Sequence, residues 1–313
     1  MKKFLFLLVA LAIAVPAYAA DGPVFSISQI VEHPSLDAVQ NGFKDRMKEL
    51  APTASFNVHI AQGNPATNTQ IANQMLGEQP NVVVAITTPS AQAVAQKIKD
   101  LPVVFTAVSD PVAAGLVKAL DTPGDNITGM TDMSPMDKHL ALVKRFVPEM
   151  KSLGTIYNAG ESNSIVMTNA LEEECKKSGI TLERATVANS SGVYQAAKSL
   201  VGRCDAIFIP LDNTVVSVLE SVIKVCEQNQ LPLLTFDTDS VARGSIAGMA
   251  MDYYKMGQQT ADIAFRIYKG ASPKDIPVET IKQLELVINL KAAKAMGVTV
   301  PDDLMTSADK IIR

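Results

Sequence analysis

Apolar residues beyond position 22 fall into two alternating patterns. Short runs rich in Val, Ile and Ala are typical of buried strands, whereas longer stretches with apolar residues at every third or fourth position are typical of helices. In the first half, the predicted strands are 24–30, 55–60, 82–87 and 103–107, and the predicted helices are 35–50, 64–77 and 90–98. This alternation predicts an α/β fold with a parallel sheet between helices.

The same series occurs again in the second half of the chain. Its predicted strands are 153–157, 181–187, 206–209 and 233–236, and its predicted helices are 135–146, 162–177, 192–202 and 214–229. Because the two series agree in order and spacing, we expect two similar doubly wound parallel-sheet domains. The chain has 313 residues, which is long enough for two cores.

The last part of the chain predicts further elements, namely strands 245–251 and 278–284 and helices 254–268 and 290–296. These come too late to begin a third domain, so we expect them to extend the two existing sheets. The chain would then cross between domains near 127–133, 246–251 and 276–282. The predicted domains are 21–129 with 249–275, and 130–248 with 276–313. Three crossings predict a hinge around a cleft.

The N-terminus has the order of a cleavable secretory signal, which we place at residues 1–20. Lys2 and Lys3 precede the apolar run 4–15, and the small-residue site Ala17-Tyr18-Ala19 follows. The apolar run is too short for a membrane anchor. A lipid-anchored protein would have Cys after the cleavage point, where this chain has Ala20 and Asp21. We therefore expect an exported, freely diffusing periplasmic protein.

Charge and composition argue against several classes of function. The formal net charge is −4, and loss of Lys2 and Lys3 would make it about −6. With no stripe of basic residues, nucleic acid is not an expected partner. The three histidines are far apart in the sequence, so we expect no metal site.

The three cysteines, Cys175, Cys204 and Cys226, form no C-x-x-C motif. Cys175 and Cys226 fall within predicted helices, where a small buried side chain is expected. Export to an oxidising compartment still allows one disulfide, with Cys204–Cys226 favoured, and at least one thiol must then stay unpaired.

The order of the elements, together with the tail from Gly248 to Phe265 and its following strand, resembles the type I periplasmic binding protein fold. Four short motifs resemble, more closely, one family of ABC-importer substrate-binding proteins, whose characterised members include receptors for tryptophan and related aromatic amino acids. The motifs are His33-Pro34-Ser35-Leu36-Asp37, Thr87-Thr88-Pro89-Ser90-Ala91-Gln92, Phe105-Thr106-Ala107-Val108-Ser109-Asp110-Pro111 and Leu211-Asp212-Asn213-Thr214.

This resemblance implies binding rather than catalysis. The expected ligand is a small molecule held between the domains, an aromatic or large aliphatic amino acid, and the expected partner is an ABC permease with its ATPase. We expect a monomer that uses no cofactor.

Loops after strands are the expected ligand site, because the carboxyl ends of parallel strands face a crevice and the following helix N-termini present unpaired N–H groups. The candidates in the first domain are Glu32, His33, Thr88, Pro89, Ser90, Ser109 and Asp110. Those in the second are Asn158, Ser162, Asn163, Ser164, Asp212, Asn213, Thr214 and Asp237.

Roles for some of these candidates follow from their chemistry. The hydroxyls of Thr88 and Ser90 are placed to hold a carboxylate, although Ser90 is also suited to be only a helix cap. Asp212 and Asp237 are the preferred partners of an ammonium group, with Asp110 and Glu32 as further options. Each Asp is alternatively a turn or capping residue.

Few aromatic side chains are available to stack against an aromatic ligand, since tryptophan is absent. The candidates are Tyr157, Phe236, Tyr253 and Tyr254.

Two other functions remain open at this point. A ligand-sensing receptor for a membrane signalling protein would use the same fold. An exported hydrolase is a weaker alternative, because the sequence has no G-x-S-x-G, H-E-x-x-H, P-loop or G-x-G-x-x-G motif. The signal argues against a repressor of this fold, which would carry a helix-turn-helix domain instead.

Overall fold

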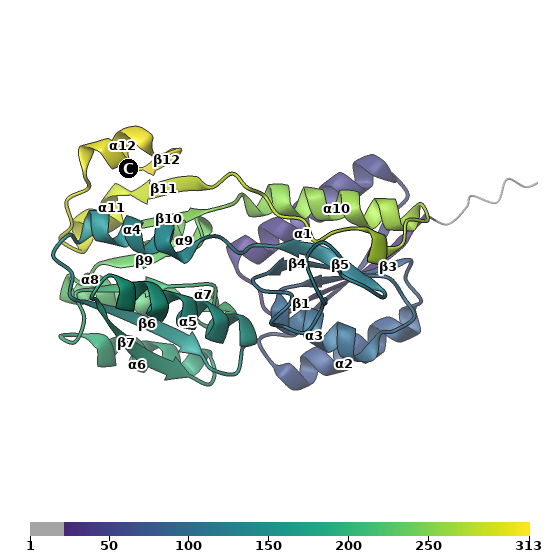
Figure 1. The fold of residues 1–313 in the computed structure, drawn as a ribbon, viewed down its shortest axis with the longest axis horizontal. Helices are drawn as coiled ribbons and strands as arrows, with labels where there is room; N and C mark the ends of the chain where they lie inside the picture. The colour runs from purple at the N-terminus through teal and green to yellow at the C-terminus, as the bar shows by residue number, and fades with distance from the viewer. Residues whose placement is uncertain (1–21) are drawn as a thin grey trace, which may run out of the picture.

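The computed structural model describes residues 22–313, so the predicted signal at 1–20 lies outside the described residues. The chain forms two α/β domains, each built on its own sheet, which lie side by side in Figure 1.

The first sheet has five parallel strands in the order β2-β1-β3-β4-β5. Every residue of β3 and β4 is buried, as expected for central strands covered by helices on both faces, whereas the edge strand β2 has no fully buried residue. The strands are β1 (Val24–Gln29), β2 (Ser55–Ile60), β3 (Val82–Ile86), β4 (Val103–Val108) and β5 (Ile127–Thr131); the helices of the first series are α1 (Pro34–Leu50), α2 (Pro65–Glu78) and α3 (Thr88–Lys97).

The second sheet repeats this arrangement and adds two strands, in the order β12-β11-β10-β9-β8-β6-β7. Its pairs are parallel except β10 with β11. The strands are β6 (Ser152–Asn158), β7 (Thr181–Val187), β8 (Ala206–Ile209), β9 (Leu233–Thr235), β10 (Ala247–Ala250), β11 (Glu285–Asn289) and β12 (Lys310–Ile312); the helices are α4 (Met136–Phe146), α5 (Ser162–Lys177), α6 (Val193–Leu200), α7 (Asn213–Ser217), α8 (Glu220–Asn229), α9 (Asp239–Arg243), α11 (Leu290–Ala295) and α12 (Asp302–Ser307).

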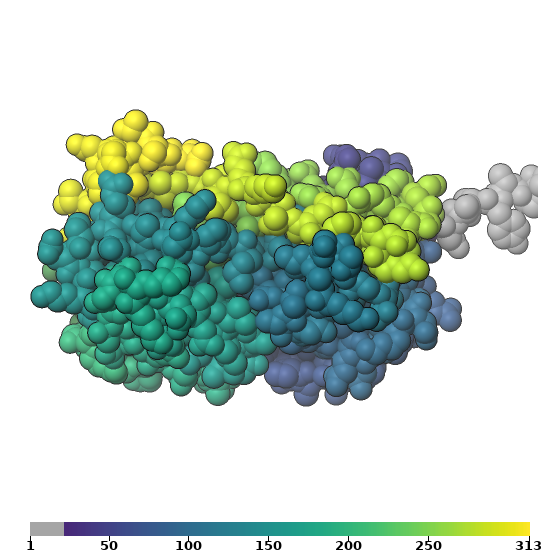
Figure 2. Space-filling model, in the orientation of Figure 1, coloured from purple at the N-terminus to yellow at the C-terminus, as the bar shows by residue number. Residues whose placement is uncertain are grey.

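Three segments cross between the two sheets. Residues 132–135 connect β5 to α4, residues 251–252 connect β10 to α10 (Tyr253–Tyr268), and residues 276–284 return the chain to β11. The third crossing pairs with the end of β5, directly before the first crossing, since Thr131 N donates to Glu279 O at 3.0 Å and Glu279 N donates to Gly129 O at 2.9 Å. In the space-filling view the two lobes abut and the late, yellow-green segment runs over both (Figure 2).

Helix α10 belongs to the first sheet although it lies late in the sequence. It packs along α1 (Figure 1), and two glycines allow the close approach of the two backbones. A Cβ atom on Gly42 would lie 2.1 Å from Tyr254 O, and one on Gly257 would lie 2.0 Å from Val39 O. Any larger residue at either position would force the helices apart.

Three predictions made from the sequence are wrong. The strand predicted at 278–284 contributes only a single bridge between Glu279 and Met130, and the strand that joins the sheet is β11. The helix predicted at 214–229 is broken between α7 and α8, where the carbonyl of Val216 accepts from Arg243 Nη1 at 2.6 Å.

The favoured Cys204–Cys226 disulfide is also absent, because all three cysteines are free and buried. The sulfur of Cys204 lies beneath Gly154 and donates to the carbonyl of Leu200 instead. The small buried side chain expected for Cys175 and Cys226 describes all three cysteines.

Candidate functional site

A small cavity lies between the two domains at the carboxyl ends of the strands. It has about 380 Å³ of empty space, part of which is open to solvent, and it combines polar groups with a few apolar side chains. The lining residues are His33, Ser35, Leu36, Thr87, Thr88, Ala107, Ser109, Asp132, Asn163, Leu211, Asp212, Asn213, Val216, Asp237 and Tyr253.

Strand order explains why the lining residues from the first domain meet. His33 follows β1, Thr87 and Thr88 follow β3, Ser109 follows β4 and Asp132 follows β5. These strands are successive neighbours in the sheet, so the four loops line one edge in that order. The second domain supplies the loops after β8 and β9, and the N-terminal turns of α5, α7 and α10 complete the wall.

The backbone is strained at two lining residues. Thr87 has φ of 84° and ψ of 161°, a region that residues with a Cβ rarely adopt, and Ala107 has φ of 52°. Ala107 lies where the register between β4 and β5 shifts, between Phe105 and Val108. Such strain persists only where the surrounding structure fixes it, and it is concentrated at ligand sites.

Five buried polar atoms of the lining residues have no hydrogen-bond partner within the described residues. They are His33 Nδ1, Thr87 Oγ1, Thr88 Oγ1, Asp132 Oδ1 and Asn163 Oδ1. An unpaired buried polar atom is costly, about 1–3 kcal/mol each. Their convergence on one cavity indicates that the cavity is built to hold a polar ligand.

Asp132 is the lining carboxylate with a free oxygen. Its Oδ2 accepts from the hydroxyl of Tyr253 at 3.2 Å, and its side chain also contacts Ser109, but Oδ1 has no partner. Burial raises the pKa of Asp132 to about 6, against the lowering effect of the hydrogen bonds from Tyr253 and Ser109. A cation placed beside Oδ1 would stabilise the ionised form.

The other two lining carboxylates are engaged within the protein. Asp212 accepts from Val215 N at 2.7 Å, which caps α7, and from Asn158 N at 2.6 Å. Asp237 accepts at Oδ1 from Ser240 N at 2.8 Å and at Oδ2 from Ser240 Oγ at 2.7 Å. Burial, with the charge of Glu161 as a second cause, raises the pKa of Asp212 above its usual range.

Glu161 organises the loop that carries Asn213 and Thr214. Its carboxylate accepts from Asn213 Nδ2 at 2.6 Å, from Thr214 N at 3.0 Å and from Thr214 Oγ1 at 2.7 Å. The side chain of Asn213 also lies beside that of His33 in the first domain, close enough to influence the pKa of His33. Burial lowers the pKa of His33, so its imidazole is neutral at pH 7.

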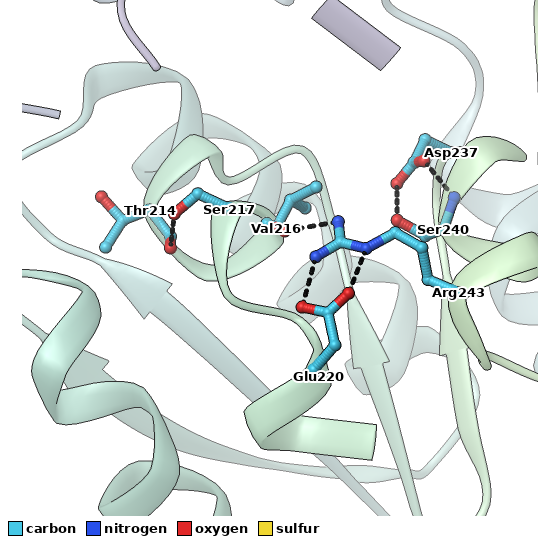
Figure 3. A network of polar contacts seen from close by, with 7 residues as sticks. All are labelled: Thr214, Val216, Ser217, Glu220, Asp237, Ser240 and Arg243. Atoms are coloured by element: carbon cyan, nitrogen blue, oxygen red, sulfur yellow. Dashed lines mark hydrogen bonds and ion pairs between the residues drawn. The ribbon is translucent and has the colours of Figure 1, made fainter. Parts of the chain in front are cut away.

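Arg243 on α9 holds the α7 side of the cavity in place (Figure 3). Its guanidinium forms two hydrogen bonds with Glu220, both at 2.8 Å, and a third with the carbonyl of Val216 at 2.6 Å. Only 13% of the Arg243 side chain is exposed. These three hydrogen bonds connect α9, the helix that follows Asp237, to the lining residue Val216 on α7.

Among the hydrogen bonds that join the two domains, two come from serine hydroxyls. Ser35 Oγ donates to Asp237 Oδ1 at 3.0 Å inside the cavity, and Ser162 Oγ donates to Gln92 Oε1 at 3.2 Å outside it. The domains are therefore closed upon each other in this structure.

Of the candidates from the sequence, the structure brings seven together around the cavity: His33, Thr88, Ser109, Asn163, Asp212, Asn213 and Asp237. Pro89, Asn158 and Thr214 instead line a larger outer groove between the domains. Ser164 is buried beside Asp212, and Ser162 makes the contact with Gln92.

Glu32, Ser90 and Asp110 do not line the cavity. Glu32 is exposed and accepts from Gln62. Asp110 caps the following turn through the N–H groups of residues 112 and 113. Ser90 is buried within the first turn of α3 and hydrogen bonds to Asn68, because the helix begins two residues earlier than predicted.

The sequence did not predict Asp132, Ser35, Leu36, Ala107, Leu211 and Val216 as lining residues, and it predicted Tyr253 only as a ring candidate. Asp132 could have been found, since it directly follows a strand; the segment 127–133 had been interpreted only as a crossing. Tyr157, Phe236 and Tyr254 do not line the cavity.

Two searches of residues 22–313 gave negative results. No helix in this range is long and apolar enough to cross a membrane. The same range contains no group of three or more His, Cys, Asp or Glu side chains suited to a metal ion.

Known proteins resemble this chain along nearly its whole length. The family model for ABC transporter substrate binding proteins matches residues 25–312. A tyrosine-binding protein from Clostridioides difficile is 38% identical over 289 residues, which cover 91% of this chain and 82% of that protein.

Two solved structures differ in how well their shape matches. An ABC domain from Streptococcus pneumonia in complex with L-Trp is 30% identical, with a TM-score of 0.89 over 93% of this chain and 99% of that one. A ligand-free, open substrate-binding protein from Clostridium difficile is 35% identical over the same shares, yet its TM-score is 0.68. The domain arrangement here is thus closer to the L-Trp complex than to the open structure.

The fold, the cavity between the domains and the family match agree with one another. This chain belongs to the family of ABC transporter substrate-binding proteins.

Proposed function

We propose that this protein is the periplasmic receptor of an ABC importer for an amino acid, with aromatic amino acids preferred. The observation that carries the proposal is the free carboxylate oxygen of Asp132 in a cavity that also holds two unpaired threonine hydroxyls. An amino acid brings the matching groups, an ammonium and a carboxylate, on one carbon atom.

In this proposal, the ammonium group pairs with Asp132 Oδ1. The ligand carboxylate lies against the hydroxyls of Thr87 and Thr88 and the N-terminus of α3, which no side chain caps and which carries partial positive charge. The side chain of the ligand then contacts the apolar lining, Leu36 and Val216.

The relatives support an aromatic ligand, since one is a tyrosine-binding protein and another was solved with L-Trp. The predicted signal at residues 1–20 supports export. We further propose that the two domains, predicted from the sequence as 21–129 with 249–275 and 130–248 with 276–313, move as two units about the crossings at residues 132–135, 251–252 and 276–284. Ligand contacts made only in the closed state would shift the population toward closure, and the permease would bind that state.

Calorimetry and thermal shift on the chain from residue 22 onward test this proposal. We expect L-Tyr, L-Trp or L-Phe to raise the melting temperature, because a ligand at 100 times its Kd stabilises the folded state by about 2.7 kcal/mol. Sugars and nucleosides should have no effect. Absence of binding by every amino acid in a complete panel would overturn the proposal. Loss of uptake of the labelled ligand in a strain that lacks this protein would support a role in import rather than in sensing.

A further inference from the structure

The proposed contacts of the ammonium and carboxylate groups leave two unpaired acceptors of the cavity unused, His33 Nδ1 and Asn163 Oδ1. His33 lies at the β1 end of the lining, whereas Asp132 lies at the β5 end. These strands are three positions apart in the sheet, about 14 Å at the usual spacing of neighbouring strands. We therefore assign His33 and Asp132 to opposite ends of a ligand.

The contacts of Asn213 determine which nitrogen of His33 carries the proton. Asn213 Nδ2 donates to Glu161 at 2.6 Å, so its Oδ1 is the atom left to accept from His33. We assign the proton of the neutral imidazole to Nε2, on the side of Asn213, since Nδ1 has no partner. A neutral imidazole carries one proton, and Nδ1 is consequently a bare acceptor.

His33 Nδ1 is buried and has no partner within the described residues. A donor on the ligand would satisfy this acceptor, and such a ligand would be favoured over one that leaves it buried and unpaired. The ammonium group is engaged at the far end, so that donor must be on the side chain. Phenylalanine and the aliphatic amino acids carry none.

We propose that His33 is a specificity residue that selects an aromatic amino acid with a ring donor, a phenolic O–H or an indole N–H, over phenylalanine. This inference rests on the proposed function. Tyrosine and tryptophan share the required chemistry, since each carries a donor on the ring, at the opposite end of the molecule from the ammonium group.

The test compares L-Tyr, L-Trp and L-Phe by calorimetry on the wild-type chain and on His33→Phe, which keeps a ring and removes the acceptor. In the wild type we expect L-Tyr, L-Trp or both to bind at least about 100-fold more tightly than L-Phe, because a site built to pair a hydroxyl rejects the analogue without it. In His33→Phe that preference should vanish, because the loss of affinity falls on L-Tyr and L-Trp far more than on L-Phe.

A second readout follows the imidazole itself. The chain has only three histidines, so the ¹⁵N resonances of His33 can be assigned by comparison with His33→Phe. Adding L-Tyr or L-Trp should shift the Nδ1 resonance, and adding L-Phe should leave it in place. A merely structural role for His33 would not produce this difference.

Each contrary outcome has a distinct meaning. Equal affinity of the wild type for L-Tyr, L-Trp and L-Phe would overturn this inference and leave the proposed function intact. Equal weakening of all three ligands in His33→Phe would assign His33 a structural role and also overturn it. Binding of no amino acid by the wild type would overturn both.

Discussion

The two walls of the cavity differ in how their polar groups are satisfied. On the second-domain wall, Asp212 and Asp237 are saturated by backbone N–H groups and serine hydroxyls, and Asn163 Oδ1 is the one unpaired atom among the lining residues described. On the wall from the first domain and the first crossing, the unpaired atoms are those of His33, Thr87, Thr88 and Asp132. The position of a carboxylate in a loop after a strand therefore does not by itself indicate ligand binding, because groups of the protein can already occupy its oxygens.

The contrast predicts that Asp132→Asn has the largest effect on binding. Removing one charge of a buried pair costs about 2–4 kcal/mol, roughly 30- to 1,000-fold in Kd. Calorimetry with the tightest ligand of the amino acid panel checks this. The matched control is Asp110→Asn, which changes a carboxylate that caps a turn outside the cavity. Equal Kd values for Asp132→Asn and Asp110→Asn would contradict the proposed difference between the two walls.

Because the oxygens of Asp212 are already paired within the protein, substitution of Asp212 should lower the stability of the protein rather than its affinity for the ligand. Asp212→Ala leaves the N–H groups of Asn158 and Val215 unpaired, and we expect about 1–3 kcal/mol less free energy of unfolding in urea. Asp212→Asn keeps an acceptor and should cost less. A fall in affinity for Asp212→Asn as steep as that for Asp132→Asn would show instead that both walls bind the ammonium group.

Acidification should move ligand affinity and the stability contributed by Asp132 in opposite directions. Below the pKa of about 6, Asp132 becomes protonated and loses its pairing with the ammonium group, so Kd should rise about tenfold from pH 7 to pH 5. In the unliganded protein, the stability that Asp132 contributes should increase as the pH falls from about 7 toward 4, because its folded pKa lies above its unfolded one. The lowered pKa values of His33 and His139 act in the opposite direction, so this contribution is measured as the difference in free energy of unfolding between the wild type and Asp132→Asn.

Titrations at several pH values check the first effect and urea unfolding checks the second. In Asp132→Asn, the pH dependence of Kd should disappear, and its persistence would assign the effect to another group.

The smallest predicted effect concerns the hydrogen bond that joins the walls. Ser35→Ala removes the donor to Asp237 and should raise Kd by roughly 2- to 10-fold, about 0.5–1.5 kcal/mol, by destabilising the closed state. Small-angle scattering without ligand should show a larger radius of gyration. Ser199→Ala, whose hydroxyl bonds within its own domain, should change neither quantity.

Periodicity predicted most of the fold, because hydrophobic spacing encodes which side of an element is buried. The exceptions are segments whose structure depends on distant partners. The helix predicted at 214–229 breaks where Arg243 binds the carbonyl of Val216, and the strand predicted at 278–284 lacks a neighbour except at Glu279.

By itself, the sequence determined two α/β domains, their crossings and the strand-end loops that form the site, because these follow from local pattern and from the direction of parallel strands. Only the tertiary structure decided which side chains in those loops remain unpaired. Asp110, Asp132 and Asp212 each follow a strand, and nothing in the local sequence distinguishes them. Their difference lies in whether distant or nearby backbone groups already occupy their oxygens, which packing alone determines.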